Sequence, residues 1–262
     1  MSAFIAALPM YDWPERRTEV DAEWAYIRDR LRERGIDAPE ALARRNADMT
    51  AVPGGIRDAA GRTIAPDPAT LPPDELDLAT LWRHPALLFA QTCWGPLETT
   101  GLEAYVAVIG QPDYSGMEGG EGEFYSSAIV MRGKGDVAAP SDGRGSLPVD
   151  LLRGGRLAFN STESMSGILG LARDLEAAGE GLAMFSSRLE TGGHRASALA
   201  VARGEADVAA LDCRSWSLFR RFEPEAAKLI HVAGWTARRK GLPYVGNRQV
   251  WDVIRQPISL LF

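Results

Sequence analysis

Short apolar runs alternate along the chain with longer segments of helical periodicity. Residues 4–8 and 86–90 are continuous apolar runs, which are typical of strands that are buried on both faces. Between these runs, apolar residues recur over 20–31 at the spacing of one helix face, and Gly35 follows as a helix stop. Strands that alternate with helices predict an α/β fold with largely parallel sheets.

The same alternation continues to the end of the chain. We predict further strands at 105–109, 127–131, 156–159, 183–186, 207–211, 229–233 and 244–245. We predict further helices at 78–82, 166–178, 195–203, 215–222 and 249–261. Three stretches rich in glycine, proline or aspartate are predicted as loops, the first of them alternatively as a hairpin: 53–73, 114–123 and 133–146.

Composition narrows the classes of function. With 262 residues, of which 45% are hydrophobic and 24% charged, the chain is typical of globular proteins and not of disordered or fibrous ones. A net charge of −6, with no basic run beyond residues 238–240, argues against nucleic-acid binding. No apolar stretch approaches the roughly 18 residues of a membrane span, so we expect no membrane insertion. The two cysteines lack metal-site spacing, and we expect neither a metal nor a cofactor.

The most informative segment joins the predicted strand at 156–159 to the helix after it. Residues 160–167 read Asn-Ser-Thr-Glu-Ser-Met-Ser-Gly, a loop rich in hydroxyl groups. The first N–H groups of a helix lack internal partners and carry the positive end of its dipole. Together with the hydroxyls of Ser164 and Ser166, they predict a cradle for an anion. Serines also cap helices that bind nothing, and this alternative stays open.

Two further segments place polar residues at strand ends. Residues 191–194 read Thr-Gly-Gly-His before a predicted helix, whose dipole would lower the pKa of His194 and keep it neutral. The alternative is a surface histidine that caps its own helix. The apolar strand at 207–211 ends in Asp212, which places this carboxylate at the sheet edge where α/β proteins bind ligands. Asp212 either meets a ligand there or caps the following helix at Ser215.

No catalytic set emerges from the sequence. The chain has no Gly-x-Ser-x-Gly elbow, no His-Glu-x-x-His pair and no Gly-x-Gly-x-x-Gly turn followed by a predicted helix. Cys93 is more typical of an inert buried thiol than of an activated one. We therefore predict no catalytic residue.

Six short motifs along the chain resemble those of one known family. They lie at 6–11 (Ala-Ala-Leu-Pro-Met-Tyr), 87–93 (Leu-Leu-Phe-Ala-Gln-Thr-Cys), 122–127 (Gly-Glu-Phe-Tyr-Ser-Ser), 160–167, 191–194 and 204–212. In these motifs the chain is similar to the phosphate/phosphonate-binding periplasmic proteins that feed ATP-driven importers. Each motif is short, and their common order from about residue 4 to 246 makes the resemblance specific.

The resemblance implies a fold and a division of the chain. The type II periplasmic-binding-protein fold consists of two α/β lobes joined by two crossing strands, with the ligand in the cleft between them. The first lobe would comprise residues 1–111 and a C-terminal return at 241–262, and the second lobe, 112–240, would be inserted into it. Cys93 and Cys213 would then lie on opposite lobes, so we expect both thiols to be free.

The resemblance also assigns ligand-binding residues. From the first lobe these are Tyr11, Gln91 and Thr92, and from the second Tyr125, Ser164, Met165, Ser166, His194 and Asp212. Ser164, Ser166 and His194 match residues that hold phosphoryl oxygens. Asp212 lies close to an acidic ligand-binding position. Residues 94–96 read Trp-Gly-Pro where the family has Gly-Tyr-Pro, a departure that affects the aromatic wall of the site.

The function that the resemblance implies is ligand capture without catalysis. The chain would be the solute-binding component of an ATP-driven importer, would bind phosphate, phosphite or a small phosphonate, and would deliver it to a membrane permease. A periplasmic location is implied, but residues 2–10 lack the basic start of a secretory signal, so a cytoplasmic location is the alternative. A cytosolic enzyme of menaquinone or pyrimidine-precursor biosynthesis on the same fold, or a ligand-sensing protein, are the alternative functions.

Overall fold

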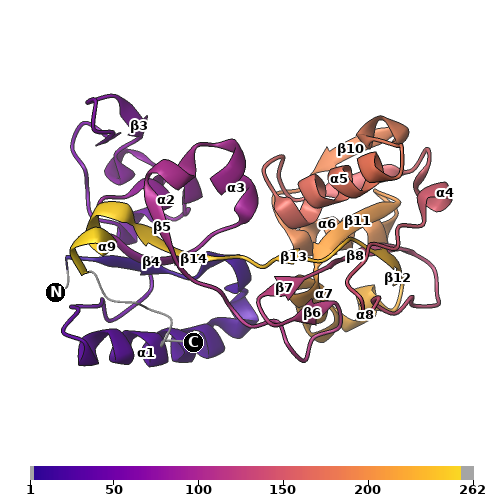
Figure 1. Cartoon of the computed structure of the whole chain (residues 1–262), viewed down its shortest axis with the longest axis horizontal. Coiled ribbons are helices and arrows are strands. Elements are labelled where there is room, and N and C mark those ends of the chain that lie inside the picture. The colour runs from indigo at the N-terminus through magenta and orange to yellow at the C-terminus, as the bar shows by residue number, and fades with distance from the viewer. Residues whose placement is uncertain (1–2, 255–262) are drawn as a thin grey trace. The chain divides into compact units, whose positions relative to one another are not determined.

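The computed structural model describes residues 3–254 and contains two compact units (Figure 1). The first unit comprises Met1–Thr92, Pro96–Gln111 and Leu242–Phe262, and the second comprises Cys93–Gly95 and Pro112–Gly241. The chain therefore enters the second unit twice, the first time for only three residues. Our division assigned Cys93–Gly95 and Gly241 to the first lobe, whereas their contacts place them in the second unit.

A four-stranded sheet with the order β1-β4-β14-β5 forms the first unit. β1 runs parallel to β4, whereas β14 runs antiparallel to both of its neighbours. Figure 1 shows the yellow C-terminal strand β14 together with strands from the first half of the chain. The strands are β1 (Ile5–Ala7), β4 (Leu87–Gln91), β5 (Val106–Gly110) and β14 (Tyr244–Asn247), and β2 (Ile56–Arg57) pairs with β3 (Thr63–Ala65) in a separate hairpin.

The core of this unit lies between the sheet and helix α1 (Arg17–Glu33), which buries its periodic apolar face. The ring of Trp24 lies 5.8 Å from that of Phe89 on β4, and Phe89 lies 5.0 Å from Tyr244 on β14. The contacts that bury α1 therefore also hold the C-terminal strand in the sheet. The other helices are α2 (Leu78–Arg83), α9 (Arg248–Ile254) and α3 (Trp94–Thr99), whose first two residues belong to the second unit.

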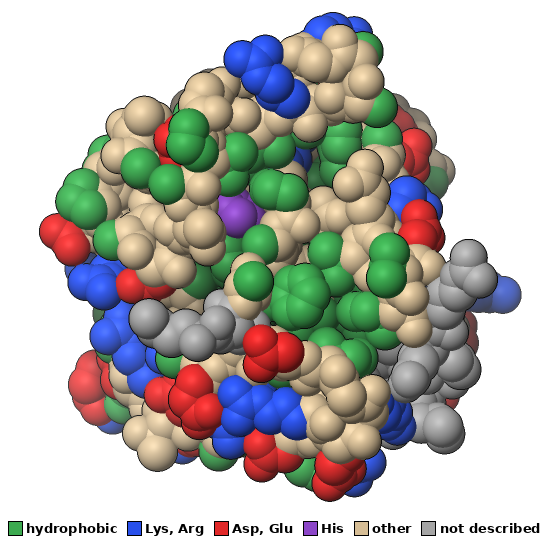
Figure 2. All heavy atoms as spheres, turned by 90° about the vertical axis from the view of Figure 1, so that its left-hand side faces the viewer, with side chains coloured by type: hydrophobic (Ala, Val, Ile, Leu, Met, Phe, Trp, Pro, Cys, Tyr) green, Lys and Arg blue, Asp and Glu red, His purple; other side chains and the backbone are tan. Residues whose placement is uncertain are grey.

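Hydrophobic side chains also reach the surface. Figure 2 shows a group of them on the side of the molecule that lies to the left in Figure 1, with acidic and basic side chains around it. Within residues 3–254, no helix combines the length and the apolar character that crossing a bilayer requires.

The second unit is built on a five-stranded sheet with the order β10-β9-β11-β8-β12. β9 runs parallel to β10 and β11, and β8 runs antiparallel to β11 and β12. Its strands are β8 (Ser127–Arg132), β9 (Arg156–Phe159), β10 (Ser187–Glu190), β11 (Val208–Asp212) and β12 (Ile230–Trp235). A smaller sheet consists of β6 (Gly120–Glu121), β7 (Phe124–Tyr125) and β13 (Arg239–Lys240).

Five α-helices lie in this unit within the described residues: α4 (Val149–Leu152), α5 (Gly170–Ala177), α6 (His194–Arg203), α7 (Cys213–Phe222) and α8 (Pro224–Ala227). A π-helical turn, Met165–Leu169, leads directly into α5. Short 3₁₀ turns in the two units are Pro9–Tyr11, Pro14–Arg16, Asn46–Asp48, Pro68–Thr70, Leu102–Ala104 and Leu182–Met184.

The prediction of largely parallel sheets is wrong. Both main sheets are mixed, because β14 in the first unit and β8 in the second pair antiparallel with the strands beside them. Neither strand follows a crossover helix packed on its own sheet, and that crossover is what forces neighbouring strands to run parallel. The strand predicted at 183–186 is also wrong, since β10 begins at Ser187. Every residue of β10 is exposed, so it lacks the apolar run that marks a buried strand.

Smaller differences concern boundaries. The helix predicted at 166–178 divides into the π-helical turn and α5. The glycine-rich stretch at 114–123 contains the short strand β6. The closing helix begins at Arg248, and residues 255–261 of the predicted segment lie outside the described residues.

An ion pair joins the beginnings of two neighbouring strands in the second unit. The Asp207 carboxylate accepts hydrogen bonds from the backbone N–H of Arg156 at 2.8 Å and from its guanidinium Nε at 2.9 Å. The Arg156 guanidinium holds the pKa of Asp207 at about 2. A carboxyl whose pKa is lowered in the folded state stabilises the fold above its unfolded pKa, and this contribution is lost as the pH falls toward 2.

We predict that Asp207→Asn lowers the free energy of unfolding at pH 7 by at most about 1 kcal/mol, because both partners are partly exposed and solvent screens the pair. The variant should also lose less stability than the native protein between pH 4 and pH 2. Chemical denaturation across this pH range measures both effects. Asp150→Asn is the control, because that carboxylate is fully exposed. If the free energy of unfolding fell by the same amount in the Asp207→Asn and native proteins between pH 4 and pH 2, the ion pair would not have the stabilising role that we assign to it.

Candidate functional site

Three polar segments of the second unit meet at one edge of its sheet. β9 and β11 are parallel neighbours, so the loops that follow them leave the sheet at the same edge. The antiparallel strand β8 begins there too, since Ser127 pairs with Asp212 at the end of β11. The loop after β10 adds His194, the first residue of α6. We call the group assembled at this edge the polar cluster: Tyr125, Ser164, Ser166, His194 and Asp212.

The centre of the polar cluster is the imidazole of His194. Its Nε2 lies 2.7 Å from the Ser166 hydroxyl and 3.4 Å from Oδ2 of Asp212. The His194 side chain is 12% exposed and that of Asp212 is 1% exposed, so little water screens these contacts. The fold thus brings together three predicted ligand-binding residues from three different elements: the π-helical turn, the start of α6 and the end of β11.

This arrangement differs from a Ser-His-Asp catalytic relay. In such a relay, the carboxylate binds one imidazole nitrogen while the serine binds the other. Here Asp212 and Ser166 face the same nitrogen, and the other hydrogen-bond partner of the imidazole is the backbone of Ala210 and not a carboxylate. Asp212 therefore cannot orient the imidazole as a base toward Ser166. The geometry supplies hydrogen bonds and does not activate a nucleophile.

Burial is the main cause of a lowered pKa at His194, and the nearby Asp212 charge opposes it. The predicted direction of the shift is confirmed, but the helix dipole that we invoked is not the leading cause. Below the ordinary pKa of 6.5, the unfolded chain binds a proton that the folded imidazole resists. The free energy of unfolding therefore decreases as the pH falls below that value.

Asp212 caps helix α7. Its Oδ1 accepts a hydrogen bond from the backbone N–H of Ser215 at 2.9 Å, and Oδ2 accepts one from the Ser215 hydroxyl at 2.6 Å. The capping alternative is therefore confirmed. Because Oδ2 also faces His194, the cap and the polar cluster share one carboxylate.

The backbone amides at the start of the π-helical turn already have partners. The N–H of Gly167 donates to the hydroxyl of Ser164, which is the N-cap, and the N–H of Met165 donates to Sγ of Cys93 at 3.3 Å. The backbone of Ser166 also hydrogen-bonds to this sulfur. The amides that the sequence predicted as part of an anion cradle thus hydrogen-bond within the chain, and the side-chain hydroxyls are the donors that the cradle still offers.

Cys93 is the residue that sequence reasoning undervalued. Its thiol is buried, and burial is the first cause of its raised pKa, to which the Asp212 charge adds. The sulfur is thus a neutral acceptor for helix amides and not a nucleophilic thiolate. The turn that carries it packs closely, since a Cβ on Gly95 would lie 1.7 Å from the carbonyl oxygen of Glu163. No local pattern signals this contact.

Both cysteines are free, as predicted, but the reason given was wrong. Cys93 and Cys213 belong to the same unit, so opposite lobes do not keep them apart.

Tyr125, on β7, completes the polar cluster with a buried phenol. Burial raises its pKa well above the ordinary value, the neighbouring Cys93 and Asp212 add to the rise, and a hydrogen bond with Ser166 opposes it. Tyr125 therefore keeps its proton and offers a neutral O–H. Together, Tyr125, Ser166 and His194 place three neutral groups beside one buried carboxylate.

Close packing fixes the loop between β9 and the π-helical turn. A Cβ on Gly167 would lie 1.9 Å from Oδ1 of Asn160, so a larger residue there would displace the Asn160 side chain. That Oδ1 is buried and has no hydrogen-bond partner among the described residues. The glycine that the sequence placed in the first turn therefore lets the loop fold tightly onto its own helix.

The remaining predicted residues are distributed as follows. Met165 is buried beside the polar cluster, and its sulfur accepts a hydrogen bond from Arg173 at 3.6 Å. Tyr11, Gln91 and Thr92 are buried in the first unit, at the end of a 3₁₀ turn, at the end of β4 and directly after β4. The hydroxyl of Thr92 has no hydrogen-bond partner among residues 3–254.

We predict that Asp212→Asn lowers the pKa of His194 further, because the amide no longer stabilises the imidazolium. NMR titration of the histidine rings measures this shift. The matched control is Asp77→Asn, since Asp77 caps α2 in the first unit by accepting the N–H of Thr80 at 2.7 Å. The control should leave the His194 titration unchanged. An unchanged or raised His194 pKa in Asp212→Asn would show that the two groups do not interact.

Comparison with known proteins gives one matching family. The family model described as the periplasmic substrate-binding protein of the phosphonate ABC transporter matches residues 99–262. No curated protein sequence matches the chain.

Many solved structures share the fold, among them the following three. PhnD1 from Prochlorococcus marinus in complex with methylphosphonate has a TM-score of 0.61 at 15% identity and covers 99% of this chain and 82% of its own. XAC2383 from Xanthomonas citri bound to ATP has a TM-score of 0.58 at 14% identity, and the match covers 99% of this chain and 82% of XAC2383. The phosphonate transporter binding component PA3383 from Pseudomonas aeruginosa has a TM-score of 0.55 at 16% identity, and the match covers 93% of this chain and 68% of PA3383. These similarities show the two-lobed type II periplasmic-binding-protein fold.

Proposed function

The chain belongs to the family of periplasmic substrate-binding proteins of phosphonate ABC transporters, and we propose that the polar cluster of its second unit binds the phosphoryl oxygens of a small phosphonate, phosphate or phosphite. The observation that carries this proposal is the buried contact of Ser166 with His194, beside Tyr125. Substrate-binding proteins capture a ligand and deliver it to a transporter. Ser166 and Asp212 face the same imidazole nitrogen of His194, and this arrangement supports binding without catalysis.

Neutral donors suit an anion that has to be released again. Tyr125 and Ser166 each carry a hydroxyl proton that can be donated to an oxyanion, while Nε2 of His194 contacts the Ser166 hydroxyl. Hydrogen bonds to an ionised acceptor are about twice as strong as neutral ones, and exclusion of water strengthens them further. Because these donor groups are neutral, the ligand carries the only charge in each of these hydrogen bonds.

The buried Asp212 carboxylate favours ligands that retain a proton. Like charges in a poorly hydrated site repel, so a fully deprotonated anion such as sulfate loses affinity next to Asp212. A phosphonate monoanion or hydrogen phosphate has an O–H group and less charge. The carboxylate reaches the ligand mainly through His194, since both of its oxygens accept hydrogen bonds from Ser215.

The wider role follows from the family, which is periplasmic. We propose that the chain acts in the periplasm and delivers its ligand to the membrane permease of an ATP-driven importer. Tyr11, Gln91 and Thr92 are proposed as the ligand contacts of the first unit on the strength of the family resemblance. Met165 is proposed as an apolar contact at the edge of the polar cluster.

We predict that Ser166→Ala weakens methylphosphonate binding about 10- to 100-fold, because a hydrogen bond to a charged group contributes about 1.5–3 kcal/mol. Isothermal titration calorimetry measures the change. Ser186→Ala is the control, since this exposed serine of the same unit only donates to the carbonyl oxygen of Gly155. Equal affinities of the Ser166→Ala and native proteins would place the phosphonate site elsewhere.

A second pair of variants tests the contribution of Cys93. Cys93→Ala removes the acceptor of the Met165 N–H, and we expect about 2- to 10-fold weaker methylphosphonate binding because Ser166 is then held less firmly. Cys213→Ala removes the other buried thiol, at the start of α7, and should leave the affinity unchanged. Calorimetry together with thermal unfolding separates affinity from stability. Equal loss of affinity in both variants would argue for general destabilisation.

A further inference from the structure

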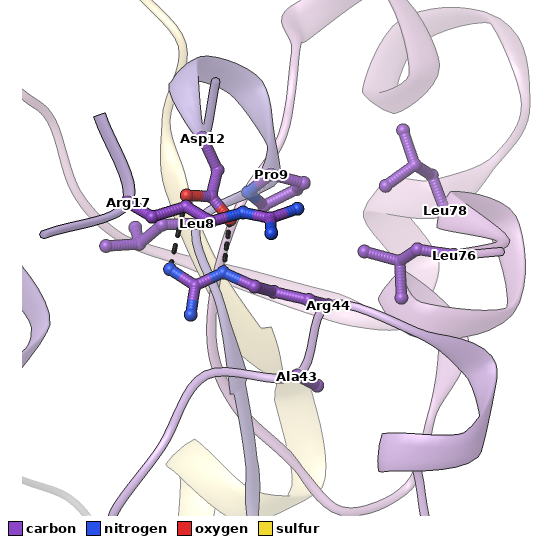
Figure 3. A pocket seen from close by; sticks show the side chains of 8 residues that line it. All are labelled: Leu8, Pro9, Asp12, Arg17, Ala43, Arg44, Leu76 and Leu78. Atoms are coloured by element: carbon purple, nitrogen blue, oxygen red, sulfur yellow. Dashed lines mark hydrogen bonds and ion pairs between the residues drawn. The ribbon is translucent and has the colours of Figure 1, made fainter. Parts of the chain in front are cut away.

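A pocket in the first unit lies outside everything assigned so far. It has a volume of about 270 Å³, just below the usual range for drug-sized ligands, so it fits a small molecule. None of its residues belongs to the polar cluster. The residues that line it are Leu8, Pro9, Asp12, Arg17, Ala43, Arg44, Leu76 and Leu78 (Figure 3).

The pocket has an apolar side and a charged side. Figure 3 shows the side chains of Leu76 and Leu78 reaching in from one side, and the charged groups of Arg17, Asp12 and Arg44 on the other. Both leucines are only half-buried. An aliphatic group placed against them would therefore gain contacts that the chain itself does not supply.

Two of the three charged groups are engaged with each other. Nε of Arg44 lies 2.5 Å from Oδ2 of Asp12 and its Nη2 lies 3.2 Å from Oδ1, which is a bidentate pair. Arg44 also lies 2.9 Å from the carboxylate of Asp21. Asp12 is 11% exposed and Arg44 is 23% exposed, so this pair is largely removed from water. Arg44 and Asp12 thus form an ion-paired wall of the pocket, and Arg44 is shared with a second carboxylate.

Arg17 is different. Within residues 3–254, its side chain makes no hydrogen bond or ion pair, although the arginine beside it, Arg16, pairs with Glu19 at 3.0 Å. As the first residue of α1, Arg17 also sits where the helix dipole disfavours a cation, so its charge adds nothing to helix stability. An anion in the pocket would give this guanidinium a partner.

We propose that this pocket binds a small organic anion, namely a carboxylate or phosphonate head on a short aliphatic chain. The head pairs with Arg17, and the chain lies against Leu76 and Leu78. A cationic ligand meets only a carboxylate that is already ion-paired, because both oxygens of Asp12 accept hydrogen bonds from Arg44. A neutral apolar ligand would cover the Arg17 guanidinium without a partner, which is unfavourable. The pocket shares no residue with the polar cluster, so this proposal stands whether or not that cluster binds a phosphonate.

NMR titration of the full-length, isotope-labelled protein tests the proposal with defined probes. Butyrate and butylphosphonate carry both required features, acetate lacks the chain, and butylammonium reverses the charge. We expect butyrate to shift the backbone signals of residues 8–12, 43–44 and 76–78. Acetate and butylammonium should bind about tenfold more weakly or not at all. Comparison of the two butyl anions shows which head group the pocket prefers.

Variants assign the binding to this pocket. Arg17→Gln should weaken butyrate binding about tenfold, as expected for the loss of one charge-assisted hydrogen bond, without a change in melting temperature, because Arg17 is exposed. Arg57→Gln is the matched control, an exposed arginine of the same unit that donates only to backbone carbonyl oxygens. Leu76→Ser should weaken butyrate but not acetate.

Two results would overturn the proposal. One is butyrate binding that Arg17→Gln leaves unchanged, and the other is equal binding of butyrate and butylammonium. Butylphosphonate is titrated into Ser166→Ala as well, because the polar cluster could take its head group. If Ser166→Ala abolishes the binding of both butyl anions and Arg17→Gln does not affect it, the ligands occupy the polar cluster and the pocket proposal is wrong.

Discussion

The site of the second unit depends on one buried carboxylate. Asp212 is 1% exposed, and a buried charge is tolerated only when hydrogen bonds and partners compensate for lost water. Ser215 supplies two of these bonds at the start of α7, and His194 stands 3.4 Å away at the start of α6. Since His194 in turn contacts the Ser166 hydroxyl, one negative charge fixes the relative positions of two helix starts and the π-helical turn.

The polar cluster of the second unit and the pocket of the first unit differ in the charge of the groups that they offer to a ligand. The polar cluster contains no lysine or arginine, and its donors are neutral because burial raises the pKa of Tyr125 and lowers that of His194. Neutral donors bind an anion well only when they point toward it. The Cys93 sulfur helps to hold the turn that carries Ser166, because it accepts hydrogen bonds from the backbone amides of Met165 and Ser166. The pocket of the first unit instead presents Arg17 as a charge beside apolar walls. A neutral site discriminates by hydrogen-bond geometry, whereas a charged one selects mainly for the sign of the ligand's charge.

Much of the secondary structure could be predicted because burial leaves a local signature. The strand predicted at 156–159 is β9, and the face predicted over 20–31 is the buried face of α1. The exposed strand β10 was misplaced because exposed residues carry no such signature. Strand direction was also misjudged, since an apolar run does not reveal whether its neighbour arrives through a crossover helix or from elsewhere in the chain.

The sequence by itself determined which residues stand at the strand ends: Ser164 and Ser166 after β9, His194 after β10 and Asp212 at the end of β11. It also determined the capping potential of Asp212, because a cap lies within one turn of its helix. Only the tertiary structure decided that Ser166 and Asp212 share one nitrogen of His194, and that Cys93 accepts an amide 72 positions further along the chain. The reason is physical: hydrogen bonds depend on distances of about 3 Å, and periodicity in the sequence does not specify such distances between residues far apart in the chain.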